Sequence, residues 1–490
     1  MPLELPDVRL AGIAPEIALS VAALIVLLVD ALVGPRSNRI HLAVLSTVGL
    51  GVSIYFAVRA WVDLPAPELQ LADMVAVDGF ASFVKITLAV FGLLTVWLSR
   101  DYLTRHAIEE SEFYALVLFA VAGMMLMAGA ADLIMIFLAL ETFSIALYVL
   151  VGFRRRSLES QESAMKYFLL GAFSSAFFLL GIAFVYGAVG STNLYTGIID
   201  FLNSNPASNA DFLVLATALL IVGLGFKVAA VPFHMWTPDA YQGAPSPVTG
   251  FMAAGSKVAG FAALLRLLDA SLFGLKWDWR PLVIGIAVVT MVVGSVLAVV
   301  QDDIKRLLAY SSIAHAGFVF TGIIAANDRG VSGALFYLAT YGLTVLGAFA
   351  IVAVLSGRDD RKVRITDYRG LFDEHPLLAG ALTLFLLSLA GVPLTSGFVA
   401  KLVVFGAAVQ AGYSWVVVVG VIASAIAAFF YLRVMVAMYM QEADEGTARP
   451  AFGPLGAGVV ALTAVATIFF GLLWSPLIEA AENATFFAGG

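Results

Sequence analysis

Two stretches of this sequence, GFKVAAVPFHMWTPDAY at residues 225–241 and LAGVPLTSGFVAKLVVF at residues 389–405, decide the fold that we predict. Each carries a small residue followed by Val-Pro inside an apolar segment, at 230–232 and at 391–393. Proline lacks a backbone N–H and clashes with the preceding helical turn, so each step interrupts a helix. At membrane depth, interrupted backbone persists only where protein buries it or where it lines a wet cavity. The pair therefore predicts two broken helices with a working site at the breaks.

Apolar residues dominate the chain from end to end. Of 490 residues, 61% are hydrophobic and only 12% are charged, and the mean hydropathy is +0.97. Runs of about 20 apolar residues, enough to cross about 30 Å of hydrocarbon, recur throughout, whereas the short alternating strands of a membrane barrel are absent. The sequence predicts an all-α polytopic membrane protein. The expected spans, about fourteen, lie near residues 12–34, 40–62, 77–99, 113–131, 132–152, 163–190, 211–245, 248–268, 281–300, 304–325, 331–356, 376–411, 414–441 and 453–475.

The two breaks fall in spans 7 and 12 and indicate an internal repeat. Five spans per repeat is an odd number, so copies in spans 4–8 and 9–13 must be inverted relative to one another. The alternative is that both prolines are ordinary kinks, but a lysine accompanies each break and favours a functional interpretation. We expect four units, namely spans 1–3 (1–111), repeat one (112–270), repeat two (271–441) and the last helix (442–490).

The repeat is imperfect around the breaks. Lys227 precedes Pro232 by five residues, whereas Lys401 follows Pro393 by eight, so strict symmetry does not superimpose the two lysines. After the first break, Thr237 followed by proline predicts a helix restart with threonine as the N-cap. Ser246 followed by proline predicts the same device at the start of span 8.

Composition also excludes several classes of site. The chain has no cysteine, which excludes disulfides, thiolate iron–sulfur ligation and cysteine-containing zinc sites within it. Its five histidines, His41, His106, His234, His315 and His375, lack ligand spacing, and nothing favours a haem between two of them. The net charge of −7 lies mostly in loops and implies no nucleic-acid surface.

Basic loop residues predict the orientation in the membrane. The N-terminus lacks the basic region and cleavage site of a signal peptide, so the first span is expected to stay as a helix. Basic clusters follow spans 1, 3, 5 and 11, at 36–39, 100–105, 154–156 and 358–369. These loops share one side if the spans alternate, and the positive-inside rule makes that side cytoplasmic. Lys276 and Arg280, between spans 8 and 9, are the main exceptions because their loop lies on the other side. The pattern otherwise predicts that both termini face away from the cytoplasm.

Four charged residues sit deep in apolar spans: Glu141, Lys227, Lys257 and Lys401. A charge at a bilayer centre costs about 2.5–3.5 kcal/mol even on the lenient insertion scale, so such a residue is usually functional. A lysine in a low-dielectric site loses proton affinity, and a nearby carboxylate restores it. These four residues therefore predict a proton relay driven by rearranging charges. The alternatives are a hydrogen-bonded structural carboxyl for Glu141 and snorkelling for Lys257.

Weaker candidates accompany the four. His234 lies beside the first break and is a candidate for a water chain, although a satisfied core histidine explains it equally well. Lys305 is either part of the relay or an interfacial residue, and His315 is either a relay group or a donor to a backbone carbonyl. Further charged residues are candidates to anchor partners, lipid or neighbouring acids (Lys85, Lys166 and Arg433) or to be interfacial (Asp30 and Asp132).

Four stretches carry a resemblance to a known family: LALETFSIALYVLVGF (138–153), ESAMKYFLLGAFSSAFFLLGIAFVYGAVGSTNL (162–194), GFKVAAVPFHMWTPDAYQGAPSPVTGFMAAGSK (225–257) and DDIKRLLAYSSIAHAGF (302–318). Over essentially its whole length the chain resembles the antiporter-like membrane subunits of respiratory complex I, and most closely the N-type subunits of bacterial NADH–quinone oxidoreductase. L-type, M-type and Mrp-type relatives typically carry two histidines four apart and a following lysine in span 11. Here Tyr337 and Tyr341 occupy the histidine positions and no lysine follows, while Lys401 agrees with the L and N types.

The resemblance implies fourteen helices with inverted repeats, and it implies roles for the buried charges. Glu141 is then the span-5 glutamate paired with Lys227, Lys257 the bridging lysine of span 8, and Lys401 the distal lysine of the second half-channel. Quinone reduction elsewhere would separate or join the Glu141–Lys227 pair, and Lys257 would pass a proton towards Lys401.

The resemblance also implies a setting. The chain would be a subunit of a proton-translocating NADH–quinone oxidoreductase in the bacterial inner membrane, beside M-type and small K-type subunits and membrane lipids. NADH, FMN, iron–sulfur clusters and quinone would be bound by other subunits. Two alternatives stay open: an Mrp-type cation/proton antiporter subunit without redox coupling, and a structural scaffold whose charges guide helix assembly.

Overall fold

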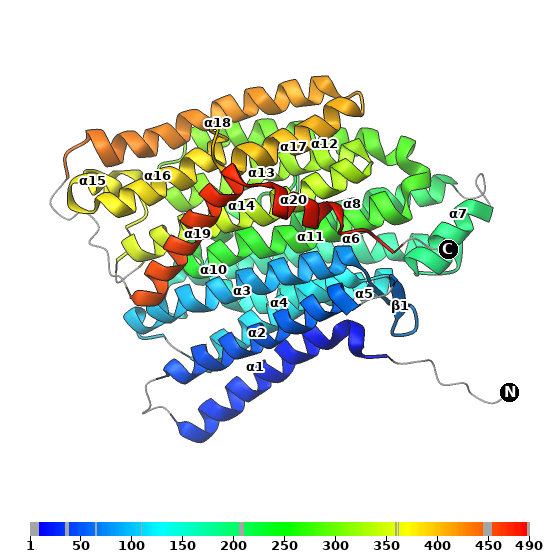
Figure 1. Ribbon diagram of the computed structural model, residues 1–490, viewed down its shortest axis with the longest axis horizontal. Coiled ribbons are helices and arrows are strands. Elements are labelled where there is room, and N and C mark those ends of the chain that lie inside the picture. Colours follow the sequence, from blue (N-terminus) through cyan, green and yellow to red (C-terminus); the bar gives the residue numbers. More distant parts are fainter. Residues whose placement is uncertain are drawn as a thin grey trace.

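The protein is a bundle of long helices whose axes lie roughly parallel (Figure 1). The computed structural model describes residues 9–34, 39–63, 66–108, 110–204, 210–357, 360, 362–443 and 453–487. The helices are α1 (Ala14–Val33), α2 (Ile40–Asp63), α3 (Gly79–His106), α4 (Ser111–Gly129), α5 (Leu133–Val151), α6 (Leu158–Val189), α7 (Asp200–Ser204), α8 (Ala210–Lys227), α9 (Trp236–Gly243), α10 (Ser246–Phe251), α11 (Lys257–Leu265), α12 (Lys276–Val299), α13 (Ile304–Ala325), α14 (Asp328–Leu355), α15 (Leu371–Glu374), α16 (Pro376–Ala390), α17 (Ser396–Gln410), α18 (Ser414–Met440), α19 (Pro454–Leu472) and α20 (Ser475–Glu482).

Short elements complete the chain. Two antiparallel strands, β1 (Glu68–Gln70) and β2 (Val75–Val77), form a hairpin before α3. Two π-helical turns, Met252–Ser256 and Arg266–Ser271, join α10 and α11 into one continuous segment, Ser246–Ser271. The remaining short turns are Ala11–Ile13, Leu194–Ile199, Phe273–Leu275 and Ile365–Tyr368.

The number of crossings agrees with the prediction. Within the described residues, twelve helical segments are long and apolar enough to cross a membrane. The two remaining crossings are the interrupted pairs α8/α9 and α16/α17, which are crossings 7 and 12 of the predicted order. The prediction of an all-α polytopic protein with two broken helices is confirmed.

Polar contacts place the loops on two sides of the bundle. Arg39, after α1, forms an ion pair with Glu110, after α3 (2.7 Å). Asp360, after α14, accepts from Tyr102 near the end of α3 (3.0 Å) and contacts Arg154 after α5 (3.4 Å). The loops after crossings 1, 3, 5 and 11 therefore share one side, as the sequence predicts. Arg36, Arg358 and Arg361, which belong to the same basic clusters, lie outside the described residues.

The two ends of the described chain lie on the opposite side. Phe80, at the start of α3, donates its backbone N–H to the carbonyl of Thr485 (3.1 Å). Arg9 forms an ion pair with Glu68 of β1 on this side (2.9 Å). Figure 1 shows the start of α1 and the segment that follows α20 on the side of β1, towards the right of the view.

Two isolated β-bridges reveal the inverted repeat. Asp132, between crossings 4 and 5, bridges to Asn193 after crossing 6, on the side of the chain ends. Asp303, between crossings 9 and 10, bridges to Arg364 after crossing 11, on the arginine-rich side. Both aspartates also cap the helix that follows, α5 and α13 respectively. The same contact thus recurs five crossings later on the opposite side, as an inverted repeat requires.

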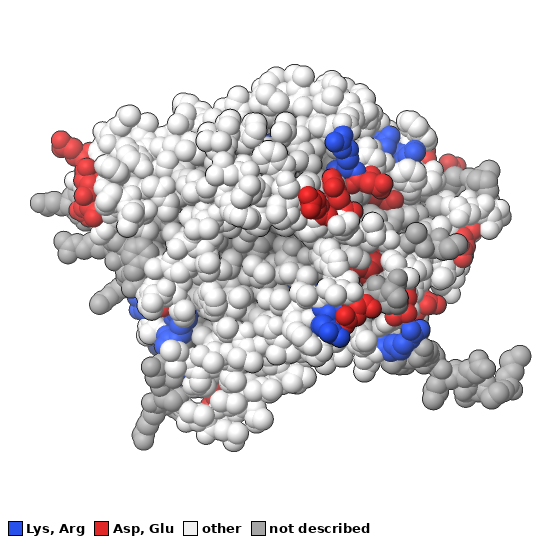
Figure 2. Space-filling view, in the orientation of Figure 1, with Lys and Arg blue, Asp and Glu red and all other residues white. Residues whose placement is uncertain are grey.

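The core lies in the middle of the bundle and contains the lysines. The segment Ser246–Ser271 is buried except at Asp269 and Ala270, and α13 and α14 are also almost entirely buried. By contrast α1, α2, α18 and α19 expose broad apolar faces, as lipid or partner helices require. Figure 2 shows charged atoms towards the two ends of the helices, with a broad, almost uncharged region between them on the visible face.

Candidate functional site

The first break follows Lys227, the last residue of α8. The chain turns through Ala229, whose φ of 61° is unusual for a residue with a side chain, and resumes as a helix at Trp236. The Trp236 indole donates to the carbonyl of Phe226 (2.9 Å), and the Val231 N–H donates to Thr290 of α12 (3.0 Å). Groups outside α8 therefore satisfy the backbone that the break exposes.

The predicted caps at this break are wrong in detail. The helix α9 begins at Trp236, one residue before Thr237, and it has no side-chain cap. Ser246 does not cap α10 either, because its hydroxyl donates to Asp360 (2.9 Å) instead. For Ser246, a tertiary hydrogen bond therefore replaces the local capping bond.

The second break separates α16 from α17. Gly391 (φ 89°) and Leu394 (φ 74°) turn the backbone through the left-handed region. The N–H groups of Gly391 and Val392 both donate to the carbonyl of Leu387 (3.0 Å each), so they close the end of α16. The helix resumes at Ser396, and Lys401 follows in its second turn.

A buried lysine binds the freed carbonyls at each break. Lys257 Nζ donates to the carbonyl of Val228, directly after α8 (2.9 Å). Lys401 Nζ donates to the carbonyls of Leu389 (3.0 Å) and Ala390 (2.8 Å) at the end of α16. The last carbonyls of a helix lack intrahelical partners and carry its partial negative charge, so they are natural acceptors for an ammonium group. The three-dimensional counterpart of Lys401 is therefore Lys257 rather than Lys227.

Lys227 lies in a box of aromatic rings. Its ammonium is 5.3–5.5 Å from the ring centroids of Phe143, Tyr148, Tyr167 and Phe226, and it donates to Ser144 Oγ (2.7 Å). The negative faces of the rings attract the cation without any carboxylate in contact. Lys227 is 1% exposed, so its ammonium is shielded from solvent.

Glu141 belongs to the same neighbourhood but does not touch Lys227. Its carboxylate accepts a hydrogen bond from Ser175 of α6, and the structure shows no direct Glu141–Lys227 ion pair. Ser144, the acceptor for Lys227, lies one helical turn after Glu141 on α5. Glu141 is half-buried at the outer face of the bundle. The paired arrangement that the resemblance implies is thus an indirect one in this structure.

His315 and Lys401 lie near each other, because both pack against the ring of Phe318. The Nδ1 atom of His315 is 2.6 Å from the Tyr337 hydroxyl, and its ring centroid is 4.8 Å from that of Tyr341. His315 Nε2, Tyr341 OH and Ser312 Oγ are buried and lack a protein hydrogen-bond partner. Buried polar atoms of this kind are the ones that ordered water satisfies.

Two other predicted residues lie apart from this path. His234 is half-buried beside the first break, and its Nδ1 has no hydrogen-bond partner. Lys305 is 1% exposed and pairs with Asp360 (2.9 Å) and the carbonyl of Ala244 (3.0 Å). Neither residue contacts Lys227, Lys257 or Lys401.

The sequence analysis missed Asp360. This loop carboxylate is buried on the arginine-rich side, where Lys305, Tyr102, Ser246 and Arg154 converge on it. Burial raises the pKa of Asp360, but Lys305, with smaller contributions from Ser356 and Arg154, outweighs burial and holds the pKa below its usual value. In the sequence it belongs to RDDR (358–361), which has the composition of a solvated loop. The signal available was Lys305, because a lysine in an apolar helix must find an acceptor and an acid is one candidate.

The remaining charged candidates have structural partners. Lys85 forms a buried ion pair with Glu16 (2.8 Å), and Lys166 bridges Glu162 (2.7 Å) and Asp239 (2.9 Å). Arg433 binds the carbonyl of Gln301. Asp132 caps α5, and Asp30 lies within 3.8 Å of Arg39. A fully buried pair that sequence reasoning did not identify, Arg266 and Asp78 (2.8 Å), joins the segment Ser246–Ser271 to the start of α3.

Comparisons with known proteins agree on one family. The family described as "NADH:quinone oxidoreductase/Mrp antiporter, TM" matches residues 130–427. The chain is 44% identical to NADH-quinone oxidoreductase subunit N of Trichlorobacter lovleyi over 89% of each chain. A chain of respiratory complex I from Thermus thermophilus with bound aureothin superposes with a TM-score of 0.80 at 34% identity, covering 96% of this chain and 100% of that one. A chain of the membrane-bound sulfane sulfur reductase, an archaeal respiratory membrane complex, gives 0.84 at 26% identity, covering 97% of each chain.

Proposed function

The chain belongs to the NADH:quinone oxidoreductase/Mrp antiporter family, within its subunit-N branch, and we propose that its buried lysines move protons as part of a bacterial NADH–quinone oxidoreductase. The observation that carries this proposal is that a buried ammonium binds the freed carbonyls of both broken helices. A carbonyl oxygen stabilises a protonated lysine less than a carboxylate in contact would. The lysine can therefore still release its proton.

The first step of the relay is electrostatic. Glu141 lies at the outer face of the bundle and is linked to Lys227 through Ser144, one turn further along α5. A charge that moves in a neighbouring subunit therefore acts on Glu141 before it acts on Lys227. Because the rings around Lys227 supply no counter-charge, its proton affinity depends on the state of Glu141.

The next transfer runs from Lys227 to Lys257. Lys227 is followed directly by Val228, whose carbonyl accepts from the ammonium of Lys257. In the proposed relay, water molecules connect the two amino groups. From Lys257 the proton continues past His315, Tyr337 and Tyr341 towards Lys401, along the buried polar atoms that lack protein partners.

The wider setting follows from the family. We place the redox cofactors NADH, FMN, iron–sulfur clusters and quinone on other subunits, and the absence of cysteine from this chain supports the iron–sulfur assignment. The chain itself is then the translocating part of the enzyme, and its neighbours are M-type and K-type membrane subunits. We place it in the bacterial inner membrane with the arginine-rich loops in the cytoplasm and both termini in the periplasm.

The test uses the assembled complex in membrane vesicles. Lys257→Met and Lys401→Met are expected to depress proton pumping per NADH oxidised, whereas Lys276→Met, at the membrane edge, is expected to leave it unchanged. Proton pumping and NADH oxidation are measured together with the amount of assembled complex. Full pumping in an assembled Lys257→Met, Lys401→Met double variant would refute the relay. Loss of assembly in both single variants, with normal activity in the complexes that do form, would favour the scaffold alternative.

A further inference from the structure

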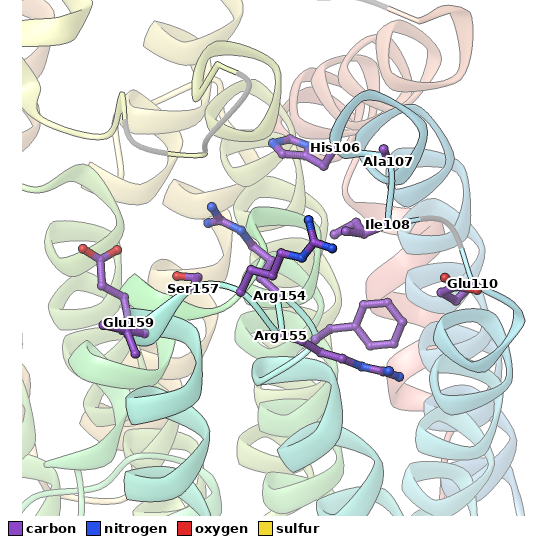
Figure 3. Close-up of a pocket in the computed structure, with 11 residues that line it drawn as sticks. His106, Ala107, Ile108, Glu110, Arg154, Arg155, Ser157 and Glu159 are labelled. Atoms are coloured by element: carbon purple, nitrogen blue, oxygen red, sulfur yellow. The ribbon is translucent and has the colours of Figure 1, made fainter.

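A basic pocket opens at the arginine-rich end of the bundle, away from the lysine relay. It has a volume of about 840 Å³ and lies between the connection that follows α3 and the connection that follows α5. Figure 3 shows the labelled residues of the first side, which are His106 at the end of α3 with Ala107, Ile108 and Glu110 after it. It also shows those of the second side, which are Arg154, Arg155 and Ser157 after α5 and Glu159 in the first turn of α6. Phe153, Arg156 and Leu158 complete the lining.

Positive charge dominates this pocket. Three consecutive arginines line it, against two carboxylates, Glu110 and Glu159. Glu110 is already neutralised by Arg39 (2.7 Å), and Arg154 is engaged by the buried Asp360 at the back of the site (3.4 Å). Among the residues that the structure describes, neither Arg155 nor Arg156 has an acidic partner within ion-pair distance. Two guanidinium groups are therefore available to a ligand.

The chemistry of the pocket fits a phosphate. A guanidinium group offers parallel N–H donors that match the oxygens of a phosphate, and two adjacent arginines can bind its oxygens from two directions. Basic pockets at the cytoplasmic ends of membrane helices are a known arrangement for anionic lipid headgroups. The volume is large enough for a glycerol phosphate headgroup rather than for a phosphate ion alone.

The surroundings of the pocket favour a lipid over a soluble phosphate. Ile108, Phe153 and Leu158 are apolar lining residues, and Leu158 is 81% exposed. Below the pocket, α5 presents an exposed apolar stripe of Val149, Ile145 and Leu138. These side chains offer a path for acyl chains directly below the arginines, which a soluble phosphate would leave unused.

We propose that this pocket binds the headgroup of an anionic glycerophospholipid, with Arg155 and Arg156 on the phosphate and the acyl chains along the outer face of α5. No relay residue lines the pocket itself, whereas the acyl chains would lie on α5 beside Glu141. The bound lipid would hold together the connections after α3 and α5.

Photo-cross-linking on the purified, delipidated complex tests the proposal. A phosphatidylglycerol with a photoreactive headgroup is added at subsaturating concentration, and its adducts on peptides covering 106–110 and 153–159 are quantified by mass spectrometry. At about a fivefold loss of affinity for each arginine, the double variant R155Q/R156Q is expected to reduce this adduct about twenty-fivefold. The matched control R59Q/R329Q removes the same charge from other exposed sites and is expected to change the adduct less than twofold.

Further arms separate the alternatives. Phosphatidylcholine with the same photoreactive group is expected to label these peptides at least tenfold less than phosphatidylglycerol. Inorganic phosphate in large excess is expected to leave the adduct in place, and complete competition by it would mean a soluble phosphate site and overturn the lipid proposal. Equal adducts in R155Q/R156Q and its control would overturn it as well. If the double variant fails to assemble, the single variants R155Q and R156Q decide the question, each with an expected fivefold loss against R59Q and R329Q.

Discussion

The two repeats solve the same problem at their helix breaks with lysines from different places. In the first repeat the ammonium on the freed carbonyl comes from Lys257, on the neighbouring crossing. In the second it comes from Lys401, on the same crossing, beyond the break. Lys227 does not bind a freed carbonyl. Its ammonium lies among aromatic rings and donates to Ser144 of α5, the helix that carries Glu141. The two repeats therefore share an ammonium group at a helix end, but this group does not come from the same sequence position in both.

The repeats also differ in how their connecting loops are fixed. Both have the aspartate bridge, Asp132 with Asn193 and Asp303 with Arg364. The second repeat adds a buried ion pair between two of its own residues, Asp360 and Lys305 (2.9 Å). Beside the bridge of the first repeat, Arg266 instead pairs with Asp78 (2.8 Å), which precedes α3 and lies outside the repeat. The electrostatic lock of the second repeat is therefore internal to it, whereas that of the first repeat ties it to α3.

The largest expected effect is on this lock. Asp360→Asn leaves Lys305 buried without a counter-charge, which costs about 3–5 kcal/mol of stability. Thermal unfolding of the purified complex measures this loss, and the control Asp373→Asn, at an exposed position of α15, is expected to change stability by less than about 0.5 kcal/mol. If the two variants have the same stability, the lock is not structural.

The lock also predicts a pH dependence. The pKa of Asp360 in the folded protein lies below its usual value, so its contribution to stability is complete above the unfolded pKa of about 3.9 and is lost as pH falls through the folded value. Wild type is therefore expected to lose stability relative to Asp360→Asn only below about pH 4. Melting curves between pH 7 and pH 3 test this, and a constant difference between the two proteins across that range would contradict it.

The next effect compares the two lysines that bind freed carbonyls. Lys401 satisfies two carbonyls and the Ser424 hydroxyl (2.7 Å), whereas Lys257 satisfies one. At about 1.5–3 kcal/mol for a hydrogen bond to a charged group, Lys401→Met is expected to destabilise the complex more than Lys257→Met does. Both variants are expected to reduce pumping at least tenfold. Equal destabilisation would mean that the two breaks are satisfied alike, and the thermal unfolding of both variants decides this.

Backbone substitutions at the two breaks are expected to have opposite signs. A Cβ added at Gly391 would lie 3.0 Å from Lys401 Cδ and 3.1 Å from its Nζ, at a φ of 89°, so Gly391→Ala should displace the lysine and cost about 1–2 kcal/mol. Ala229→Gly relieves a φ of 61° and should gain up to about 1 kcal/mol. Unfolding midpoints measure both, and a loss of stability in Ala229→Gly would contradict the comparison.

The smallest expected effect concerns the aromatic box of the first repeat. Tyr148→Leu removes one of four rings around Lys227, with an expected cost of about 0.5–2 kcal/mol in the stability of the charged lysine. Tyr148→Phe keeps the ring and serves as the matched control. The relative pumping rate of the two variants between pH 6 and pH 9 measures the effect, because a less stable cation gives up its proton at lower pH. Identical profiles would show that the ring does not stabilise the ammonium.

Much of the fold could be predicted from the sequence because the membrane leaves few choices. Fourteen apolar runs, two Val-Pro steps and an odd repeat length lead to the observed order of crossings with breaks in α8/α9 and α16/α17. The four deep charges also stood out, because each is an exception in an apolar run. Local capping was predicted less well, because Thr237 and Ser246 do not cap their helices. The Ser246 hydroxyl binds Asp360 instead, whereas α9 begins one residue before Thr237.

The sequence by itself determined which residues must be explained: a buried glutamate, three buried lysines and two interrupted helices, all costly in hydrocarbon. Only the tertiary structure decided how they are satisfied. It places Lys257 rather than Lys227 on the carbonyl of the first break, separates Glu141 from Lys227, and brings Asp360 from a loop onto Lys305. The physical reason is that the cost of burying a charge depends on the residue alone, whereas its compensation depends on which acceptors reach it across the bundle.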